Sequence, residues 1–287
     1  MKKTGFYNLP LLFVWIFFFI TISIQAQNNQ KHLVILYTND THSRIEPLSP
    51  NDSKYPDKGG MLRRAAFVEK KRKENANLLL LHAGDIIQGT PYFNLFSGKA
   101  DIEFMNALGY DASCLGNHEF DLGLDTLYQL VALADFPFVA TNYDFSETPL
   151  AGMLKKYLIL QRDDLKIGIL GIGVNPEGLI FSRNYQGMKY LDPIKAAQET
   201  ATLLKKKEKC DIVICLSHLG FYENKRVMGD VKLVKKTAHI DIVIGGHSHK
   251  FLPKPKSIRN KTGKKVTVSQ MGDRGIRVGC LDVFFVQ

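Results

Sequence analysis

The sequence predicts an α/β protein with buried sheets. Short apolar runs alternate with longer polar stretches that have helical spacing, as expected when strands and helices follow one another. Most of the apolar runs are uninterrupted, which is typical of strands covered on both faces. We therefore expect residues 27–287 to form one domain, whose first strand begins near residue 31.

The order of elements follows directly from these runs. Strands are predicted at residues 33–37, 78–81, 112–115, 138–141, 166–172, 212–216 and 242–244. Helices are predicted between them at residues 60–74, 101–108, 124–134, 193–209 and 230–237. Two further strand-like runs, 265–270 and 277–285, follow without a helix between them. The polar stretch 49–58, with two prolines, is predicted to be a surface loop.

Residues 1–26 have the features of an export signal. Lys2 and Lys3 precede an apolar run from Leu9 to about Ile24, and the small residue Ala26 ends it. The run is slightly shorter than the roughly 20 residues of a membrane-spanning helix. Its many aromatic residues leave an uncleaved anchor as the alternative. We expect an exported protein, periplasmic or at the cell surface, that contacts the membrane only if this segment is uncleaved.

The charge and the cysteines exclude other classes. The net charge is +10, but the basic groups 70–73 and 205–207 lie in stretches with helical spacing, so we expect solvated helix faces and no nucleic-acid partner. All four cysteines lie in or beside apolar runs and match no zinc-binding spacing, so we expect buried free thiols: Cys114, Cys210, Cys215 and Cys280.

Side chains that can bind metals follow five of the predicted strands. These strand ends carry Asp40 and His42, then Asp85, then Asn117 with His118 and Asp121, then His218, and last His247 with His249. Ligands in α/β proteins collect beyond the carboxyl ends of the strands, so these side chains can build one site. Glycines beside them allow sharp turns close to an ion.

The number of donors favours two metal ions rather than one. Imidazole and carboxylate together suit zinc, manganese or iron. Two ions about 3.5–4 Å apart can share a carboxylate and a hydroxide, which is a strong nucleophile at neutral pH. Each motif alone has an ordinary interpretation, since a Gly-Asp after a strand is usually a turn and a single histidine is usually a hydrogen-bonded surface residue. Their joint occurrence, in order and each after a strand, favours the metal site.

These motifs resemble those of the calcineurin-like metallophosphoesterase superfamily: Asp-x-His, Gly-Asp, Gly-Asn-His, a histidine after a strand, and Gly-His-x-His. Within it, residues 37–44, 59–63, 84–89 and 116–121 resemble the 5′-nucleotidase and UDP-sugar hydrolase family. The resemblance covers essentially the whole chain after the signal. It implies a four-layer α/β/β/α metallophosphoesterase sandwich.

The resemblance also implies a role for each residue. Asp40, His42 and His249 would bind one ion, Asp85 would bridge both, and Asn117, His218 and His247 would bind the second. His118 would stabilise the transition state and help the leaving oxygen depart, oriented by Asp121. That pairing is physically sound, because a carboxylate beside an imidazole fixes its tautomer and favours its charged form. His82 is not a motif ligand and is expected to support the site or the core.

The resemblance implies hydrolysis of phosphomonoesters, foremost nucleoside 5′-monophosphates, by a hydroxide that bridges two metals. Alternative substrates are 2′,3′-cyclic nucleotides or nucleotide sugars, and a different class is a non-catalytic metal-binding subunit of a split nucleotidase. The family usually carries a C-terminal nucleotide-binding domain, which this chain is expected to lack because it stops at Gln287. A separate chain would then supply that domain for the small-molecule substrate.

Overall fold

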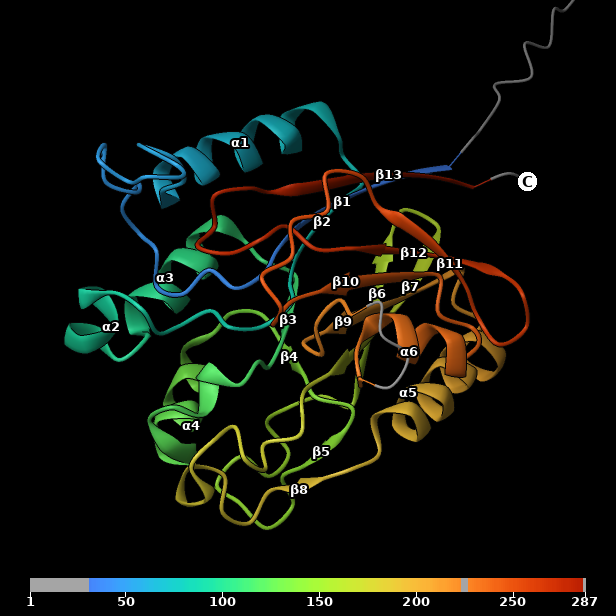
Figure 1. Cartoon of the computed structure of the whole chain (residues 1–287). Coiled ribbons are helices and arrows are strands. Elements are labelled where there is room, and N and C mark those ends of the chain that lie inside the picture. The colour runs from blue at the N-terminus through green and yellow to red at the C-terminus, as the bar shows by residue number, and fades with distance from the viewer. Residues whose placement is uncertain (1–30, 223–226, 286–287) are drawn as a thin grey trace, which may run out of the picture.

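The computed structural model describes residues 31–222 and 227–285, which form two sheets flanked by helices (Figure 1). The predicted signal peptide, residues 1–26, lies outside the described residues. Within the described ranges, every helix is too short or too polar to cross a membrane.

The first sheet has the strand order β13-β1-β2-β3-β4. Four of its strands run parallel: β1 (Lys31–Thr38), β2 (Leu78–His82), β3 (Ala112–Cys114) and β4 (Phe138–Val139). The edge strand β13 (Gly279–Phe285) pairs antiparallel with β1. Its helices are α1 (Met61–Glu74), α2 (Pro91–Phe96), α3 (Lys99–Leu108) and α4 (Gly123–Leu133), and a 3₁₀ turn, η1 (His118–Phe120), precedes α4.

The second sheet has the order β11-β12-β10-β9-β7-β6. Its parallel strands are β7 (Leu165–Ile172), β9 (Ile212–Ser217), β10 (Ile242–Gly245) and β12 (Lys265–Ser269). Two antiparallel strands close its edges: β6 (Tyr157–Arg162) and β11 (Lys256–Arg259). Its helices are α5 (Pro193–Thr202), which continues into the π-helical turn η3 (Leu203–Lys207), and α6 (Asp230–Lys236). The remaining short elements are β5 (Tyr143–Asp144), β8 (Lys189–Tyr190) and the 3₁₀ turn η2 (Ser182–Asn184).

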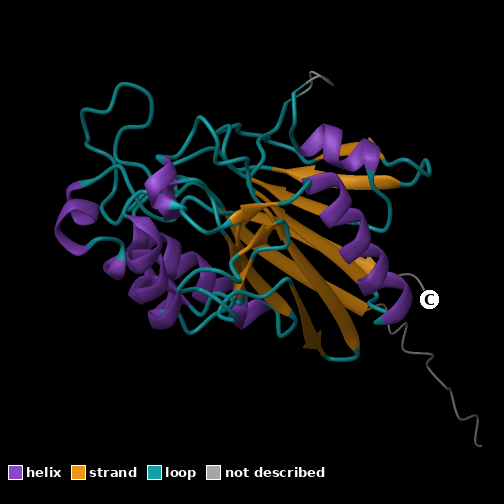
Figure 2. Cartoon of the chain, turned by 90° about the horizontal axis from the view of Figure 1, so that it is seen from below, coloured by secondary structure: helices purple, strands orange, loops and turns teal. Residues whose placement is uncertain are grey.

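Three apolar cores separate four layers. In β1, Leu33 and Ile35 pack against the second sheet, whereas Val34 and Leu36 pack against the helices, because successive side chains of a strand point to opposite faces. A third core lies between the second sheet and its helices α5 and α6. Figure 2 shows the strands between two groups of helices. The predicted four-layer α/β/β/α sandwich is confirmed.

The structure differs from the sequence predictions mainly at short or exposed elements, whose residue patterns do not indicate a helix or a strand clearly. The short helix α2 and the edge strands β6 and β11 were not predicted, because β6 is only half-buried and β11 is mostly exposed. The fourth predicted strand ends early, at Val139, since the next backbone N–H, that of Ala140, donates to the carbonyl of Lys155 outside the sheet. The prediction of four buried thiols is wrong for Cys280, which is exposed on the edge strand β13.

We expect Tyr37→Phe to lower the free energy of unfolding by about 1–3 kcal/mol. The buried Tyr37 hydroxyl donates to Oγ of Ser269 at 2.6 Å and links β1 of one sheet to β12 of the other. Removing the Tyr37 hydroxyl leaves the buried hydroxyl of Ser269 without this donor. Urea unfolding of Tyr37→Phe, Ser269→Ala and the double variant measures the link. If the two single effects simply add, the hydrogen bond contributes nothing to the pairing of the sheets.

Candidate metal centre

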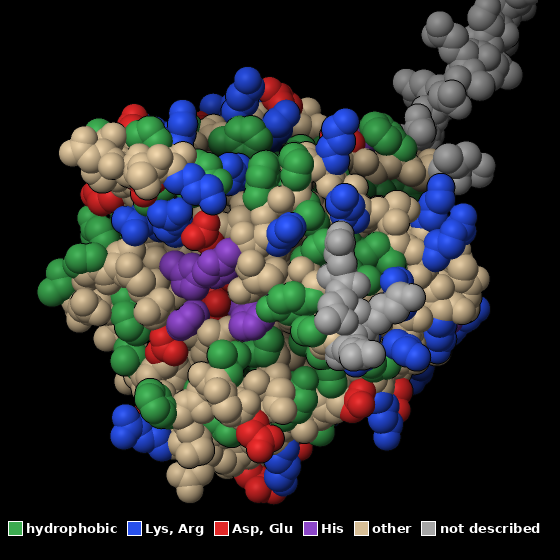
Figure 3. Space-filling model, viewed as in Figure 1, with side chains coloured by type: hydrophobic (Ala, Val, Ile, Leu, Met, Phe, Trp, Pro, Cys, Tyr) green, Lys and Arg blue, Asp and Glu red, His purple; other side chains and the backbone are tan. Residues whose placement is uncertain are grey.

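The two sheets bring the seven predicted ligands together at one edge. Strands β1, β2 and β3 of the first sheet end just before Asp40, Asp85 and Asn117. Strands β9 and β10 of the second sheet end just before His218 and His247. Strands β1, β2 and β3 run parallel to one another, and so do β9 and β10, so their carboxyl ends share one direction within each sheet. Figure 3 shows histidine and acidic side chains gathered on one face of the molecule.

Six of the seven residues form two groups that share one carboxylate. Asp40, His42, Asp85 and His249 place one ligand atom each within 4.8 Å of one another. The same holds for Asp85, His218 and His247. Asp85 therefore lies between the groups, where a carboxylate that bridges two ions would lie.

Asn117 joins the second group through its side-chain amide. Its Oδ1 lies 2.9 Å from Nδ1 of His247. The next residue, His118, belongs to neither group. Its backbone N–H donates to Oδ1 of Asp85 at 2.9 Å, and its Nδ1 lies 2.8 Å from Oδ2 of Asp121. The structure thus places His118 against the site with its ring engaged by Asp121.

Most of the clustered residues have a strained backbone. Asp40, His42, Asp85, His247 and His249 have φ angles of 49°, 50°, 57°, 72° and 51°. Positive φ is uncommon for residues other than glycine, and such residues cluster at active sites. In this conformation each side chain turns from the end of its strand into the site within one to four residues.

Two glycines let these loops touch. A Cβ on Gly84 would lie 2.6 Å from the backbone nitrogen of Gly116. A Cβ on Gly116 would lie 2.2 Å from Oδ1 of Asp85. The loops after β2 and β3 are therefore in direct backbone contact. A side chain at Gly116 would collide with Asp85, and one at Gly84 would collide with Gly116 and His218.

The donor set fits divalent metal ions. Nδ1 of His42 is buried and makes no hydrogen bond within the described parts of the chain. Nδ1 of His218 donates to the carbonyl oxygen of Ala83 at 2.7 Å, which directs Nε2 into the site, 3.0 Å from Oδ2 of Asp85. Buried imidazole lone pairs beside carboxylates are the donors that zinc, manganese and iron accept.

The electrostatics point the same way. Burial lowers the pKa of His218, but the charges of Asp85 and Asp40 outweigh it and raise the pKa to about 10 in the protein without ions. Burial, with the charge of His218, lowers the pKa of His247 to about 4. A negative field that holds a proton on a buried imidazole also attracts a divalent cation.

Three supporting residues were not singled out from the sequence. The carboxylate of Glu119 accepts hydrogen bonds from the backbone N–H groups of Asp85 at 3.0 Å, Ile86 at 2.7 Å and Gly116. It thereby joins the loops after β2 and β3. Burial and the charge of Asp85 raise the pKa of Glu119 to about 7, although these N–H groups favour its ionised form. In the sequence, the position of Glu119 directly after the Gly-Asn-His motif could have indicated this supporting role.

Asn39 and Gln270 support the opposite side of the site. The amide of Asn39 donates to Oδ2 of Asp40 at 2.5 Å and to the carbonyl oxygen of Gly272 at 2.6 Å. Gln270 donates to the carbonyl oxygen of Gly246 and accepts from Oγ of Ser248 at 2.8 Å. Gln270 was predicted as the last residue of the strand 265–270, whereas β12 ends at Ser269, so Gln270 follows the carboxyl end of a strand as the candidate ligands do.

His82 lies outside both groups, as expected. It is fully buried, its Nδ1 accepts a hydrogen bond from the backbone N–H of Gly84 at 3.0 Å, and its Nε2 lies 3.2 Å from Oγ1 of Thr41. It supports the turns that precede Asp85 and His42.

Comparisons with known proteins agree with this geometry. Residues 33–251 match the family described as calcineurin-like phosphoesterase. The chain is 36% identical to a 5′-nucleotidase of Bos taurus over 88% of its own length and 46% of the relative. It is 33% identical to a snake venom 5′-nucleotidase of Gloydius brevicauda over 96% and 49%. The solved 5′-nucleotidase precursor of Thermus thermophilus matches with a TM-score of 0.79 and 34% identity, over 89% of this chain and 52% of that one. The chain thus spans about half the length of the curated relatives it matches.

We expect Glu119→Gln to lower the free energy of unfolding of chelator-treated protein by about 1–3 kcal/mol. The amide offers one acceptor oxygen where the carboxylate offers two, so at least one buried N–H loses its partner. Chemical denaturation measures the change, and Glu103→Gln, on the exposed face of α3, is the matched control. Equal stability of the two variants would contradict this role for Glu119.

Proposed function

The chain belongs to the calcineurin-like phosphoesterase family, and we propose that it hydrolyses phosphomonoesters with two divalent metal ions. The observation that supports this most strongly is Asp85, whose carboxylate belongs to both groups of candidate ligands. A shared carboxylate is the feature that distinguishes a two-metal site from two separate sites.

We propose that Asp40, His42 and His249 hold one ion, that Asn117, His218 and His247 hold the other, and that Asp85 contacts both. When bound, the ions would lower the pKa of a water molecule and neutralise charge on the phosphoryl oxygens. The protein fixes its ligands before any ion arrives, because Asn39, Glu119 and Gln270 tie their loops together.

His118 is proposed to act on the leaving group. Burial lowers the pKa of His118, but the hydrogen bond with Asp121 and the charge of Asp85 outweigh it, so the net pKa is raised. Asp121 engages Nδ1, which leaves Nε2 as the nitrogen that donates to the substrate. The His118 side chain is 29% exposed, so a protonated imidazole is available to an incoming phosphate ester. It would stabilise charge on the phosphoryl group and protonate the leaving oxygen.

Nucleoside 5′-monophosphates are the proposed substrates. The support is the identity of 33–36% to proteins named 5′-nucleotidases over most of this chain. Cyclic nucleotides and nucleotide sugars are the alternatives, and turnover of AMP against these compounds discriminates between them. Export of the protein, and a separate chain that supplies a nucleotide-binding domain, stay predictions.

We expect purified protein to bind two divalent ions per chain, and chelation to abolish turnover of p-nitrophenyl phosphate until manganese or zinc is restored. Asp85→Ala should lose tight binding of both ions, because its carboxylate belongs to both groups. Elemental analysis after dialysis measures the content, with the exposed Asp125→Ala as the control. A single tight ion that Asp85→Ala leaves in place would rule out the two-metal site.

For His118→Ala we expect kcat to fall by about 10²–10⁴-fold, the usual effect of a positioned acid or base. The metal content should stay the same, since His118 belongs to neither group of ligands. Steady-state kinetics and elemental analysis of the same preparation test both points, with His32→Ala, at the start of β1 and the opposite end of that strand from the site, as the control. Near-normal turnover would remove His118 from the mechanism, and loss of metal would make it a ligand.

A further inference from the structure

A buried arginine lies behind the metal centre without a partner. Arg64, in the first turn of α1, is only 4% exposed. Its Nε and Nη2 atoms are buried and make no hydrogen bond within residues 31–222 and 227–285, and no ion pair of Arg64 is found there. Buried guanidinium groups are normally paired, because removing the charge from water is costly. Arg64 therefore lacks the partner that its burial requires.

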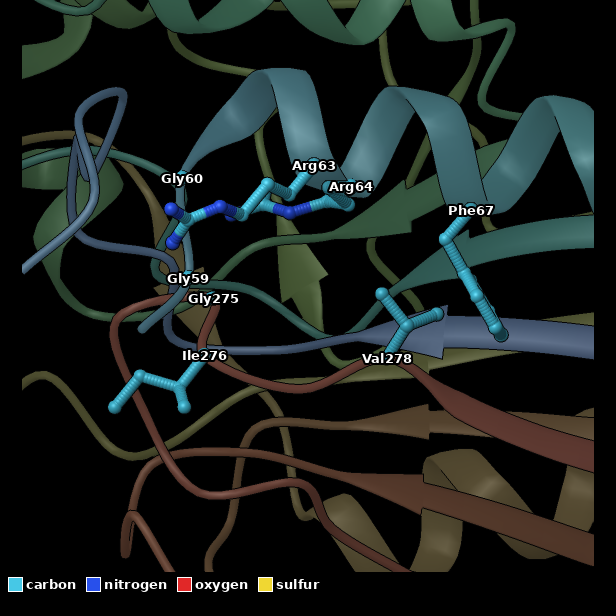
Figure 4. Close-up of a pocket in the computed structure, with 8 residues that line it drawn as sticks. All are labelled: Gly59, Gly60, Arg63, Arg64, Phe67, Gly275, Ile276 and Val278. Atoms are coloured by element: carbon cyan, nitrogen blue, oxygen red, sulfur yellow. The ribbon is translucent and has the colours of Figure 1, made fainter. Parts of the chain in front are cut away.

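A cavity of about 240 Å³ lies beside this side chain. Its walls are the start of α1 and the segment before β13, as Figure 4 shows, and include Gly59, Gly60, Arg64, Phe67, Gly275 and Val278. Gly275 has a φ of +56°, and a Cβ there would lie 1.8 Å from Nη2 of Arg64. The guanidinium therefore lies directly against the backbone of the second wall.

The start of α1 adds positive potential at the same place. The N-cap residue is Gly60, so no side chain caps the helix, and no acidic residue lies in its first turn. The N–H of Met61 donates to the carbonyl oxygen of Ile45 at 2.7 Å, which leaves the N–H groups of Leu62 and Arg63 at the start of the helix. Such N–H groups of a first turn carry a partial positive charge that favours anions. The helix terminus and the unpaired guanidinium thus face one cavity.

No neighbouring carboxylate forms an ion pair with Arg64 within the described residues. Arg63 is paired with Asp57 at 3.1 Å, and Arg274 with Asp273 at 3.0 Å. The buried carboxyl group of Asp101 accepts a hydrogen bond from Oγ of Ser43 at 2.8 Å and interacts with the charge of Arg64 from beyond ion-pair distance. The Nε and Nη2 donors of Arg64 therefore stay without an acceptor in this region.

We propose that this cavity is a binding site for a small oxyanion, held by Arg64 and the start of α1. A guanidinium group presents its N–H donors as a fork that matches the oxygens of carboxylate, phosphate or sulfate. The cavity volume of about 240 Å³ is enough for a small oxyanion and is below the roughly 300 Å³ of pockets for larger ligands. The proposal does not depend on the proposed function, because none of the candidate metal ligands lines the cavity.

The site would act on the metal centre through the segment before β13. The backbone N–H of Arg274, next to Gly275, donates to the carbonyl oxygen of Asp40 at 2.6 Å. Gly272 accepts from the amide of Asn39 at 2.6 Å. An anion that fixes Gly275 would therefore also fix the backbone beside Asp40.

The test uses the full metal-loaded chain with sulfate, inorganic phosphate and acetate as separate probes. We expect saturable stabilisation in thermal unfolding, with an affinity about tenfold or more weaker in Arg64→Gln. Lys70→Gln removes the same charge from the exposed face of α1 and should behave as wild type. The ranking of the three probes identifies the class of oxyanion. In crystals soaked with selenate, an anomalous peak should lie beside Arg64, apart from any at the metals.

Phe67→Glu covers the case in which Arg64→Gln does not fold. It places a carboxylate three residues from Arg64 on the same helix, where it can pair with the guanidinium and occupy the cavity. This variant should lose the response to all three probes. Anion effects that are equal in wild type, Arg64→Gln and Phe67→Glu, or selenate bound only at the metals, would overturn the proposal.

Discussion

The site depends on the face-to-face packing of the two sheets. Asp40, Asp85 and Asn117 come from one sheet and His218, His247 and His249 from the other, so neither sheet holds all of the candidate ligands. The core between the sheets consists of side chains such as Leu33, Ile35, Ile169 and Ile214, which are fully buried. Because these side chains are closely packed, the two sheets cannot slide past each other easily. The packing therefore keeps the strand ends of one sheet opposite those of the other.

Within that frame, buried polar side chains hold a strained backbone in place. Glu119 and Gln270 hydrogen-bond backbone groups of loops that carry candidate ligands, and Asn39 ties the carboxylate of Asp40 to the carbonyl oxygen of Gly272. Positive φ angles at the ligands cost free energy, which these contacts offset. These contacts thus orient the candidate ligands within the protein itself, and they require buried polar groups that tolerate little change.

Much of this arrangement was readable in the sequence because it rests on simple physical rules. Uninterrupted apolar runs marked buried strands such as β7 and β9, and polar residues after them marked the site. Edge strand β6 lacked the signal, since a half-buried strand mixes polar and apolar residues. The burial of Arg64 could not be predicted from the sequence either, because a basic residue in a helix is usually solvated. Its burial follows from the segment around Gly275, which lies far away in the sequence.

The order of the ligands along the chain has a consequence for biosynthesis. His42 is made early, and His249 of the same candidate group follows 207 residues later. During translation the early ligands emerge long before their late partners, so an incomplete chain cannot hold an ion in that group. Contacts of such long sequence separation also form slowly in folding. In the proposed two-metal site, the first group can therefore hold an ion only after the segment that carries His249 has folded against β1.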